Sequence, residues 1–144
     1  METDSRITAV ELQCFQASLA RVTGQARFFE QFYARLFRES DEIKDIFRGR
    51  DLTSIIAKLR MTLSMVAQAA EGRPGLEMYL EMLGNIHRRV QVEARFFRHW
   101  RTALLDTVAR YDAQYDPRVE AVWRRVIDRV IACMQQGEQE NPAP

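Results

Sequence analysis

Two histidines are the residues in this sequence best suited to bind a metal, and one of them, His87, lies inside a helical pattern between Leu83 and Val92. A neutral imidazole is a common ligand of iron and zinc. Zinc usually takes three or four protein ligands, whereas a haem needs one axial ligand because the porphyrin supplies four nitrogens. His87 therefore indicates haem before zinc, although a lone histidine on a helix is more often a hydrogen-bonded or surface residue.

The size and charge of the chain favour a single domain without a strongly charged partner. A chain of 144 residues can bury about two-thirds of its unfolded surface, enough for a core that also encloses a ligand. Its 21 basic side chains nearly balance 20 acidic ones. No net field therefore indicates nucleic acid or an anionic membrane as a partner.

Neither export nor membrane insertion is signalled, so we expect a cytoplasmic protein. No apolar run approaches the roughly 20 residues of a membrane span, and residues 1–6 lack the order of a secretory signal. Cys14 and Cys133 lie near opposite ends of the chain, without the short spacing of a metal knuckle or redox pair. We expect both to be reduced thiols.

The apolar residues recur at intervals of three and four, which predicts an all-α protein. A capping box at Thr8 opens the first helix, which should end near Gly24. Asp116 and Pro117 give an N-cap and first position for the last helix. Further helices are expected at 28–37, 41–47, 51–70, 76–90 and beyond Val92, and 135–144 should be a frayed tail.

Two blocks of sequence resemble the bacterial single-domain globins, the haem domain of flavohaemoglobins and globin-coupled sensors. The first block combines residues 32–37 with residues 42–47, and the second runs from Leu83 to His87 and on to Val92 and Phe97. Both keep the spacing of those families, and the similarity covers residues 8–135. The resemblance implies a globin fold, a three-over-three helical sandwich that encloses haem, over residues 1–144 as one domain.

The resemblance also implies roles for single residues. His87 would be the proximal ligand, Phe47 would stack on the porphyrin, and Tyr33 would donate a hydrogen bond to bound gas. Leu83, Val92 and Phe97 would line the proximal side. We expect His99, which stands among charged residues, to lie at the surface.

The distal side leaves two registers open. Counting back from His87 without a gap places Ile55 at the usual distal position and Leu59 over the haem, and we prefer this register although it gives Arg60 a usually apolar place. Sliding by three residues places Lys58 and Thr62 there instead, with a more regular apolar stripe on the helix. In neither register does the distal position hold the glutamine that is often found there in these families.

The resemblance implies a haem b protein that reversibly binds dioxygen, nitric oxide and carbon monoxide. Phe97 stands where flavohaemoglobins have a tyrosine, so the proximal histidine should be less strongly polarised. The sequence lacks a glycine fingerprint for flavin or nicotinamide, so nitric oxide dioxygenase turnover would need an external reductase. A gas sensor acting on a partner in trans and a non-haem interaction module are the alternatives, and a homodimer is left open.

Overall fold

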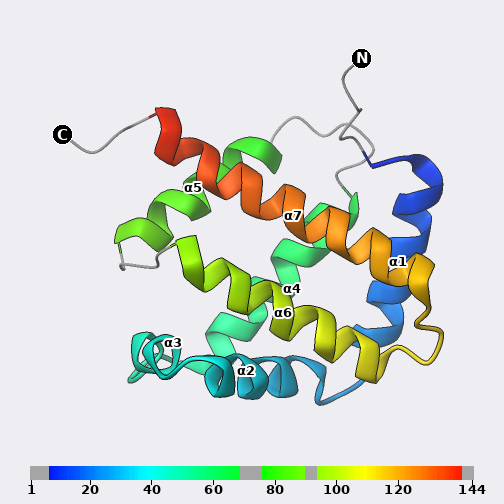
Figure 1. Ribbon diagram of the computed structural model, residues 1–144, viewed down its shortest axis with the longest axis horizontal. Helices are drawn as coiled ribbons and strands as arrows, with labels where there is room; N and C mark the ends of the chain where they lie inside the picture. Colours follow the sequence, from blue (N-terminus) through cyan, green and yellow to red (C-terminus); the bar gives the residue numbers. More distant parts are fainter. Residues whose placement is uncertain (1–6, 69–75, 90–93, 141–144) are drawn as a thin grey trace.

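The computed structural model describes residues 7–68, 76–89 and 94–140, and within these ranges it contains helices and no strands (Figure 1). The all-α prediction is confirmed. The helices are α1 Ala9–Thr23, α2 Phe28–Glu39, α3 Asp41–Ile46, α4 Leu52–Gln68, α5 Leu76–Arg89, α6 Ala94–Tyr111 and α7 Pro117–Glu140.

The ends of several helices follow from local chemistry. The Thr8 hydroxyl accepts from the Glu11 N–H while the Glu11 carboxylate accepts from the Thr8 N–H, which is the predicted capping box. The Asp116 carboxylate accepts from the Val119 N–H at 2.8 Å and so caps α7. Gly49 has φ +78°, and this left-handed conformation allows the turn between α3 and α4.

The last helix is longer than the sequence analysis expected. We predicted a frayed tail from Gln135 onward, whereas α7 continues to Glu140. Glutamine and glutamate are good helix formers, and the first proline beyond Pro117 is Pro142. Polar composition therefore did not end the helix.

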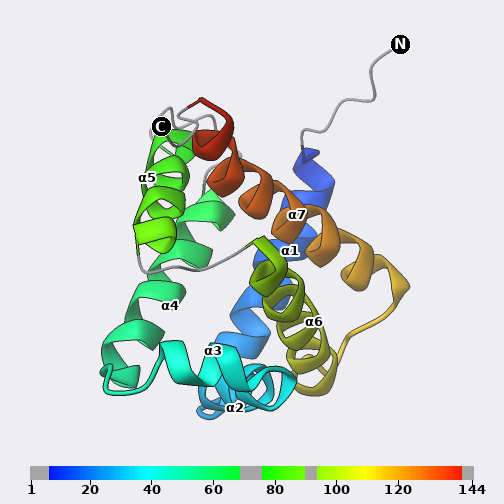
Figure 2. The same ribbon diagram turned by 60° about the vertical axis from the view of Figure 1, so that its left-hand side comes forward.

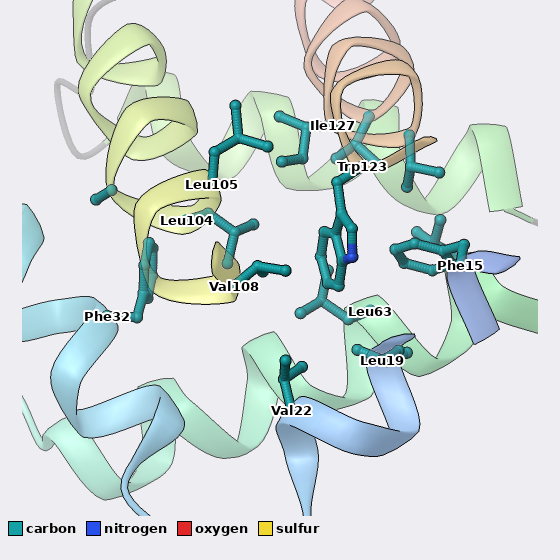
Figure 3. Packing of buried hydrophobic residues seen from close by; sticks show 14 of the residues in the cluster. Phe15, Leu19, Val22, Phe32, Leu63, Leu104, Leu105, Val108, Trp123 and Ile127 are labelled. Atoms are coloured by element: carbon teal, nitrogen blue, oxygen red, sulfur yellow. The ribbon is translucent and has the colours of Figure 1, made fainter. Parts of the chain in front are cut away.

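Among the described residues, a hydrophobic core joins the helices (Figure 3). The fully buried Trp123 of α7 contacts Phe15 of α1 edge-to-face, with ring centroids 4.7 Å apart. Leu63 of α4 and Leu104 of α6 belong to the same cluster. The stripe predicted for α1 is buried in full, at Leu12, Phe15, Leu19 and Val22.

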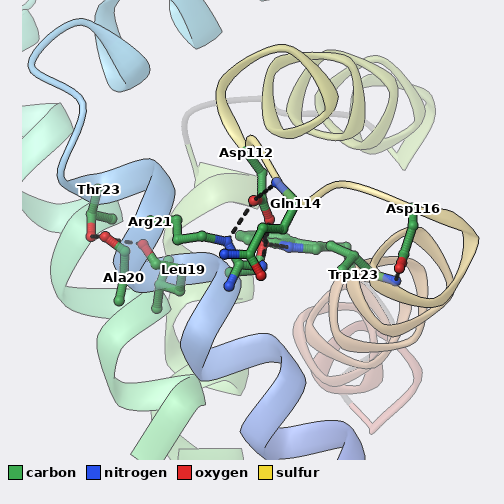
Figure 4. Close-up of polar contacts among 10 residues, drawn as sticks. Leu19, Ala20, Arg21, Thr23, Asp112, Gln114, Asp116 and Trp123 are labelled. Carbon is green, nitrogen blue, oxygen red and sulfur yellow. Dashed lines mark hydrogen bonds and ion pairs between the residues drawn. The ribbon is translucent and has the colours of Figure 1, made fainter.

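One buried carboxylate ties α1 to the α6–α7 turn (Figure 4). Asp112 accepts two hydrogen bonds from the Arg21 guanidinium and one from the Ser18 hydroxyl, at 2.5 to 2.9 Å. Ser18 in turn accepts from the Trp123 indole N–H at 2.8 Å, and the Gln114 N–H donates to Asp112. Every member of this network has a partner, as a buried polar cluster requires.

Candidate functional site

His87 lies in the last turn of α5 with one ring nitrogen already engaged. Its Nδ1–H donates to the Leu83 carbonyl oxygen at 2.7 Å, because that oxygen can only accept. The bond fixes the tautomer in which Nε2 carries the free lone pair. Burial lowers the pKa of His87, although the bond to Leu83 opposes the shift. The imidazole is therefore neutral at pH 7, the form that binds a metal.

A glycine allows α5 to pack closely against α7, and this packing positions the helix that carries His87. A Cβ on Gly84 would lie 2.8 Å from the Met134 carbonyl carbon and overlap its oxygen. Only glycine allows this approach. Gly84 comes three residues before His87, on the side of α5 that contacts Met134 of α7.

Of the three proximal residues predicted from the sequence, the structure describes Leu83 and Phe97. The rings of His87 and Phe97 meet edge-to-face with centroids 5.9 Å apart. Leu83 and Phe97 are half-buried and pack against the core. Val92 lies outside the described residues.

Tyr33 and Phe47 lie together, as the first sequence block predicted. Their ring centroids are 5.7 Å apart, and Phe37 contacts both rings. Tyr33 is 4% exposed, and burial raises the pKa of its phenol above the usual range. Among the described residues its hydroxyl has no hydrogen-bond partner. Tyr33 is therefore a neutral phenol whose O–H donor is not taken up by any described residue.

Phe47 is held in place by the short helix α3. The Phe47 N–H ends this helix by donating to the Ile43 and Lys44 carbonyl oxygens. Arg95, on the first turn of α6, forms a two-pronged ion pair with Glu42 of α3. The pair connects α3 to the helix that carries Phe97.

On α4, the residues of both distal registers share one side of the helix. Ile55 and Leu59 are half-buried and pack against the core, and Lys58 is exposed. The Thr62 hydroxyl lies 3.4 Å from the Tyr79 hydroxyl of α5. Since Tyr79, Leu83 and His87 are spaced by four residues, they lie along one side of α5. Thr62 therefore faces the helix that carries His87.

Tyr79 is the residue that the sequence analysis missed. Its spacing of eight from His87, with Leu83 midway, is the signal that could have placed it on the same side of α5. The unusual Arg60 is also explained, because its guanidinium lies over the Phe29 ring at 4.8 Å. His99 is about one-third exposed and lies 3.3 Å from Glu39, as its charged surroundings suggested.

The donor set fits a haem better than a bare metal ion. Within the described ranges, no three side chains of histidine, cysteine, aspartate or glutamate gather closely enough to hold a metal. One neutral imidazole beside aromatic and aliphatic side chains matches a cofactor that brings four nitrogens of its own and needs an apolar wall. None of the described helices is long and apolar enough to cross a membrane.

The described residues form seven helices that carry one neutral imidazole and one buried phenol, an arrangement that suits a helical haem-binding protein. The model of the globin family matches residues 30–134. The chain belongs to the globin family, and this membership supports a haem cofactor and gas binding in general. Among curated proteins, none matches the sequence.

Solved structures show the same fold. A Pseudomonas aeruginosa protein described as structurally highly homologous to a human haemoglobin is 26% identical, with a TM-score of 0.81 over 88% of this chain and 97% of that one. A hexacoordinated haem protein from an anhydrobiotic tardigrade is 16% identical, with a TM-score of 0.78 over 95% and 99%. Shortfin mako haemoglobin is 19% identical, with a TM-score of 0.70 over 89% and 96%. The last two likenesses concern the fold alone.

Proposed function

We propose that this globin holds haem b through His87 and reversibly binds dioxygen, with carbon monoxide and nitric oxide as further ligands. The observation that carries the proposal is the 2.7 Å bond from His87 Nδ1 to the Leu83 carbonyl, because it leaves a neutral Nε2 free to ligate iron. The description of the Pseudomonas aeruginosa relative as a haemoglobin homologue supports the same function.

The chain's own residues would position the cofactor and tune the gas site. When bound, haem would supply an iron that can take up a diatomic gas. Phe47 and Phe97 would fix the apolar macrocycle by ring contacts, and Leu83 would do so with its aliphatic side chain. Tyr33 would donate its free O–H to the gas, since the raised pKa keeps the phenol protonated.

For the distal wall we propose the side of α4 that carries Ile55, Leu59 and Thr62, with Lys58 at its exposed edge. The contact of Thr62 with Tyr79 supports this orientation, because Tyr79 shares a side of α5 with Leu83 and His87. None of these three residues has a side-chain amide. Tyr33 would therefore be the main hydrogen-bond donor to the gas.

Reduction of the iron would depend on an external reductase, because the sequence holds no motif for flavin or nicotinamide. With such a partner, the protein would convert nitric oxide to nitrate, with dioxygen as the oxidant and source of both added oxygen atoms and the reductase as the source of one electron. The Phe97 ring beside His87 has no hydroxyl with which to polarise the imidazole. Gas binding is therefore the primary proposal, and an enzymatic role the second.

The decisive experiment removes the imidazole. His87→Ala should lose stoichiometric haem, and added imidazole should restore a part of it by occupying the vacated coordination position. His99→Ala is the matched control and should keep parental haem content, because His99 lies at the surface beside Glu39. A His87→Ala protein with normal haem content and an unchanged ferrous spectrum would show that another residue ligates the iron.

A further inference from the structure

An open cleft of about 310 Å³ lies between α6 and α7. Figures 1 and 2 show these two helices side by side and running in opposite directions, joined by a short turn. The volume is at the lower end of the roughly 300–1,000 Å³ that small-molecule sites occupy. None of the residues that line the cleft belongs to the proposed haem site, so the cleft is a separate candidate site.

The charged residues of the cleft are sorted by sign along the two helices. Arg101 of α6 and Arg124 of α7 line one end. Arg101 also donates to Asp128, four residues beyond Arg124, so these parts of the two helices lie together. Asp106 and Glu120 line the other end, nearer the turn. The cleft therefore has a basic end and an acidic end.

Tyr115, in the turn between the two helices, lies at the acidic end. Burial raises the pKa of its phenol, and the negative charges of Glu120 and Asp106 add to the shift. Both carboxylates are therefore close to the same phenol. Leu105 is 6% exposed and lies one turn from Arg101, so it adds an apolar side chain to the lining.

Helix geometry sets the distance between the basic and acidic ends. Asp106 follows Arg101 by five residues, which is about 7.5 Å along the helix axis. Arg124 follows Glu120 by four residues, or about 6 Å. An extended dipeptide spans about 7 Å, whereas a single amino acid spans about 3.5 Å and a tripeptide about 10 Å. A zwitterion of dipeptide length therefore matches both ends of the cleft.

The charged groups are available to such a ligand. Asp106 is exposed and has no hydrogen bond or ion pair within the part of the chain that the structure describes. Arg124 pairs with Glu120 at 3.0 Å, and both side chains are more than a third exposed. An exposed pair of this kind contributes little to stability, so a ligand can replace it. The Arg101 guanidinium has five N–H donors, of which Asp128 takes at most two.

We propose that the cleft between α6 and α7 binds a small zwitterion of dipeptide length, with its ammonium group at Asp106 and Glu120 and its carboxylate at Arg101 and Arg124. Leu105 contacts the apolar part of the ligand. The affinity is modest, with a Kd of about 1 mM, because the charges that hold the ligand are close to solvent. Binding is independent of haem, since the two sites share no residue.

Equilibrium dialysis of the purified protein against radiolabelled alanylalanine tests this site. One molecule should bind per chain. N-acetyl-alanylalanine and alanylalanine amide each lack one charge and should bind about three- to tenfold more weakly. Free alanine and trialanine should also bind more weakly, because their charges are too close together or too far apart. The proposal is overturned if alanylalanine shows no saturable binding, or if the neutral N-acetyl-alanylalanine amide binds equally well, which would indicate adventitious apolar contact only.

Two variants at exposed positions test the orientation of the ligand. Asp106→Asn should weaken the binding of alanylalanine but not of its N-acetyl form, which has no ammonium group. Arg124→Gln should weaken the binding of alanylalanine but not of its amide, which has no carboxylate. Arg110→Gln, at an exposed position of α6 outside the cleft, is the control and should bind as the parent does. Circular dichroism checks that each variant folds. Parental binding by both cleft variants, or an equal loss in Arg110→Gln, would rule out the proposed site.

Discussion

Gly84 and Met134 meet backbone to backbone, so that α5 lies against α7 with no side chain between them. The contact joins residues 50 positions apart and lies one turn from His87. The position of the His87 imidazole therefore depends on the position of α7. A substitution at Gly84 should therefore affect both stability and cofactor binding, although Gly84 has no side chain that could contact the haem.

We expect Gly84→Ala to lower the free energy of unfolding by about 1 to 3 kcal/mol, because the new Cβ overlaps the Met134 carbonyl and α5 must move away. Haem should also dissociate faster as His87 shifts. Urea unfolding and haem transfer to an acceptor protein measure the two effects. Gly24→Ala is the control: at φ −73° a Cβ there approaches the Ala20 oxygen only to 3.3 Å. Equal effects of both substitutions would contradict the role given to the α5–α7 contact.

The local features of the fold could be predicted from the sequence. Thr8 and Asp116 cap helices where their side chains reach nearby N–H groups, and such bonds depend on only a few residues. The contacts of Ser18 with Asp112 and of Gly84 with Met134 could not be predicted. They depend on how helices far apart in sequence cross, which helical periodicity does not specify.

The candidate site shows the same division. The 14-residue spacing of Tyr33 and Phe47 matched a family motif, and the rings do meet. Tyr79 belongs to neither sequence block, and its spacing from His87 could not predict its contact with Thr62, which lies on another helix. The roles of Tyr33, Ile55, Lys58 and His87 toward a bound ligand remain predictions that the following experiments address.

We expect Tyr33→Phe to speed dioxygen dissociation by about ten- to a hundredfold. A hydrogen bond to a partly charged acceptor in a dry site contributes roughly 1.5 to 3 kcal/mol, and about 1.4 kcal/mol corresponds to a factor of ten. Carbon monoxide should respond much less, since it carries little charge on its outer atom. Stopped-flow dissociation measures both rates. Tyr111→Phe, on α6 against Phe28, is the control and should leave both unchanged. Parental dioxygen release from a folded, haem-loaded Tyr33→Phe protein would mean that the phenol points elsewhere.

Two substitutions on α4 decide between the distal registers. If Ile55 faces the gas, Ile55→Gln should slow dioxygen release by adding an amide donor, and Lys58→Ala should change little at the exposed edge. If the slid register holds, Lys58→Ala should alter ligand kinetics, while Ile55→Gln should only lower stability by placing an amide among core residues. Dissociation rates and thermal unfolding of both variants separate these outcomes.

Asp112 should make the protein sensitive to acid. Burial by itself raises the pKa of this carboxyl, but hydrogen bonds from Arg21, Ser18 and the Gln114 N–H outweigh it and hold the pKa below its usual value. A carboxylate with a lowered folded pKa stabilises fully above its unfolded pKa, about 3.9. That contribution is lost as the pH falls through the folded pKa.

We therefore expect Asp112→Asn to lower the free energy of unfolding by about 2 to 4 kcal/mol at pH 7, because Arg21 loses its buried partner and Ser18 its charged acceptor. The difference from the parent should stay constant down to about pH 5 and shrink below about pH 4, where the parental carboxylate becomes protonated. Urea unfolding followed by circular dichroism at each pH gives both curves. Asp106→Asn, at an exposed position of α6, should differ little from the parent. A difference that persists unchanged at pH 3 would mean that the shape of the Asp112 side chain, rather than its charge, holds α1 to the α6–α7 turn.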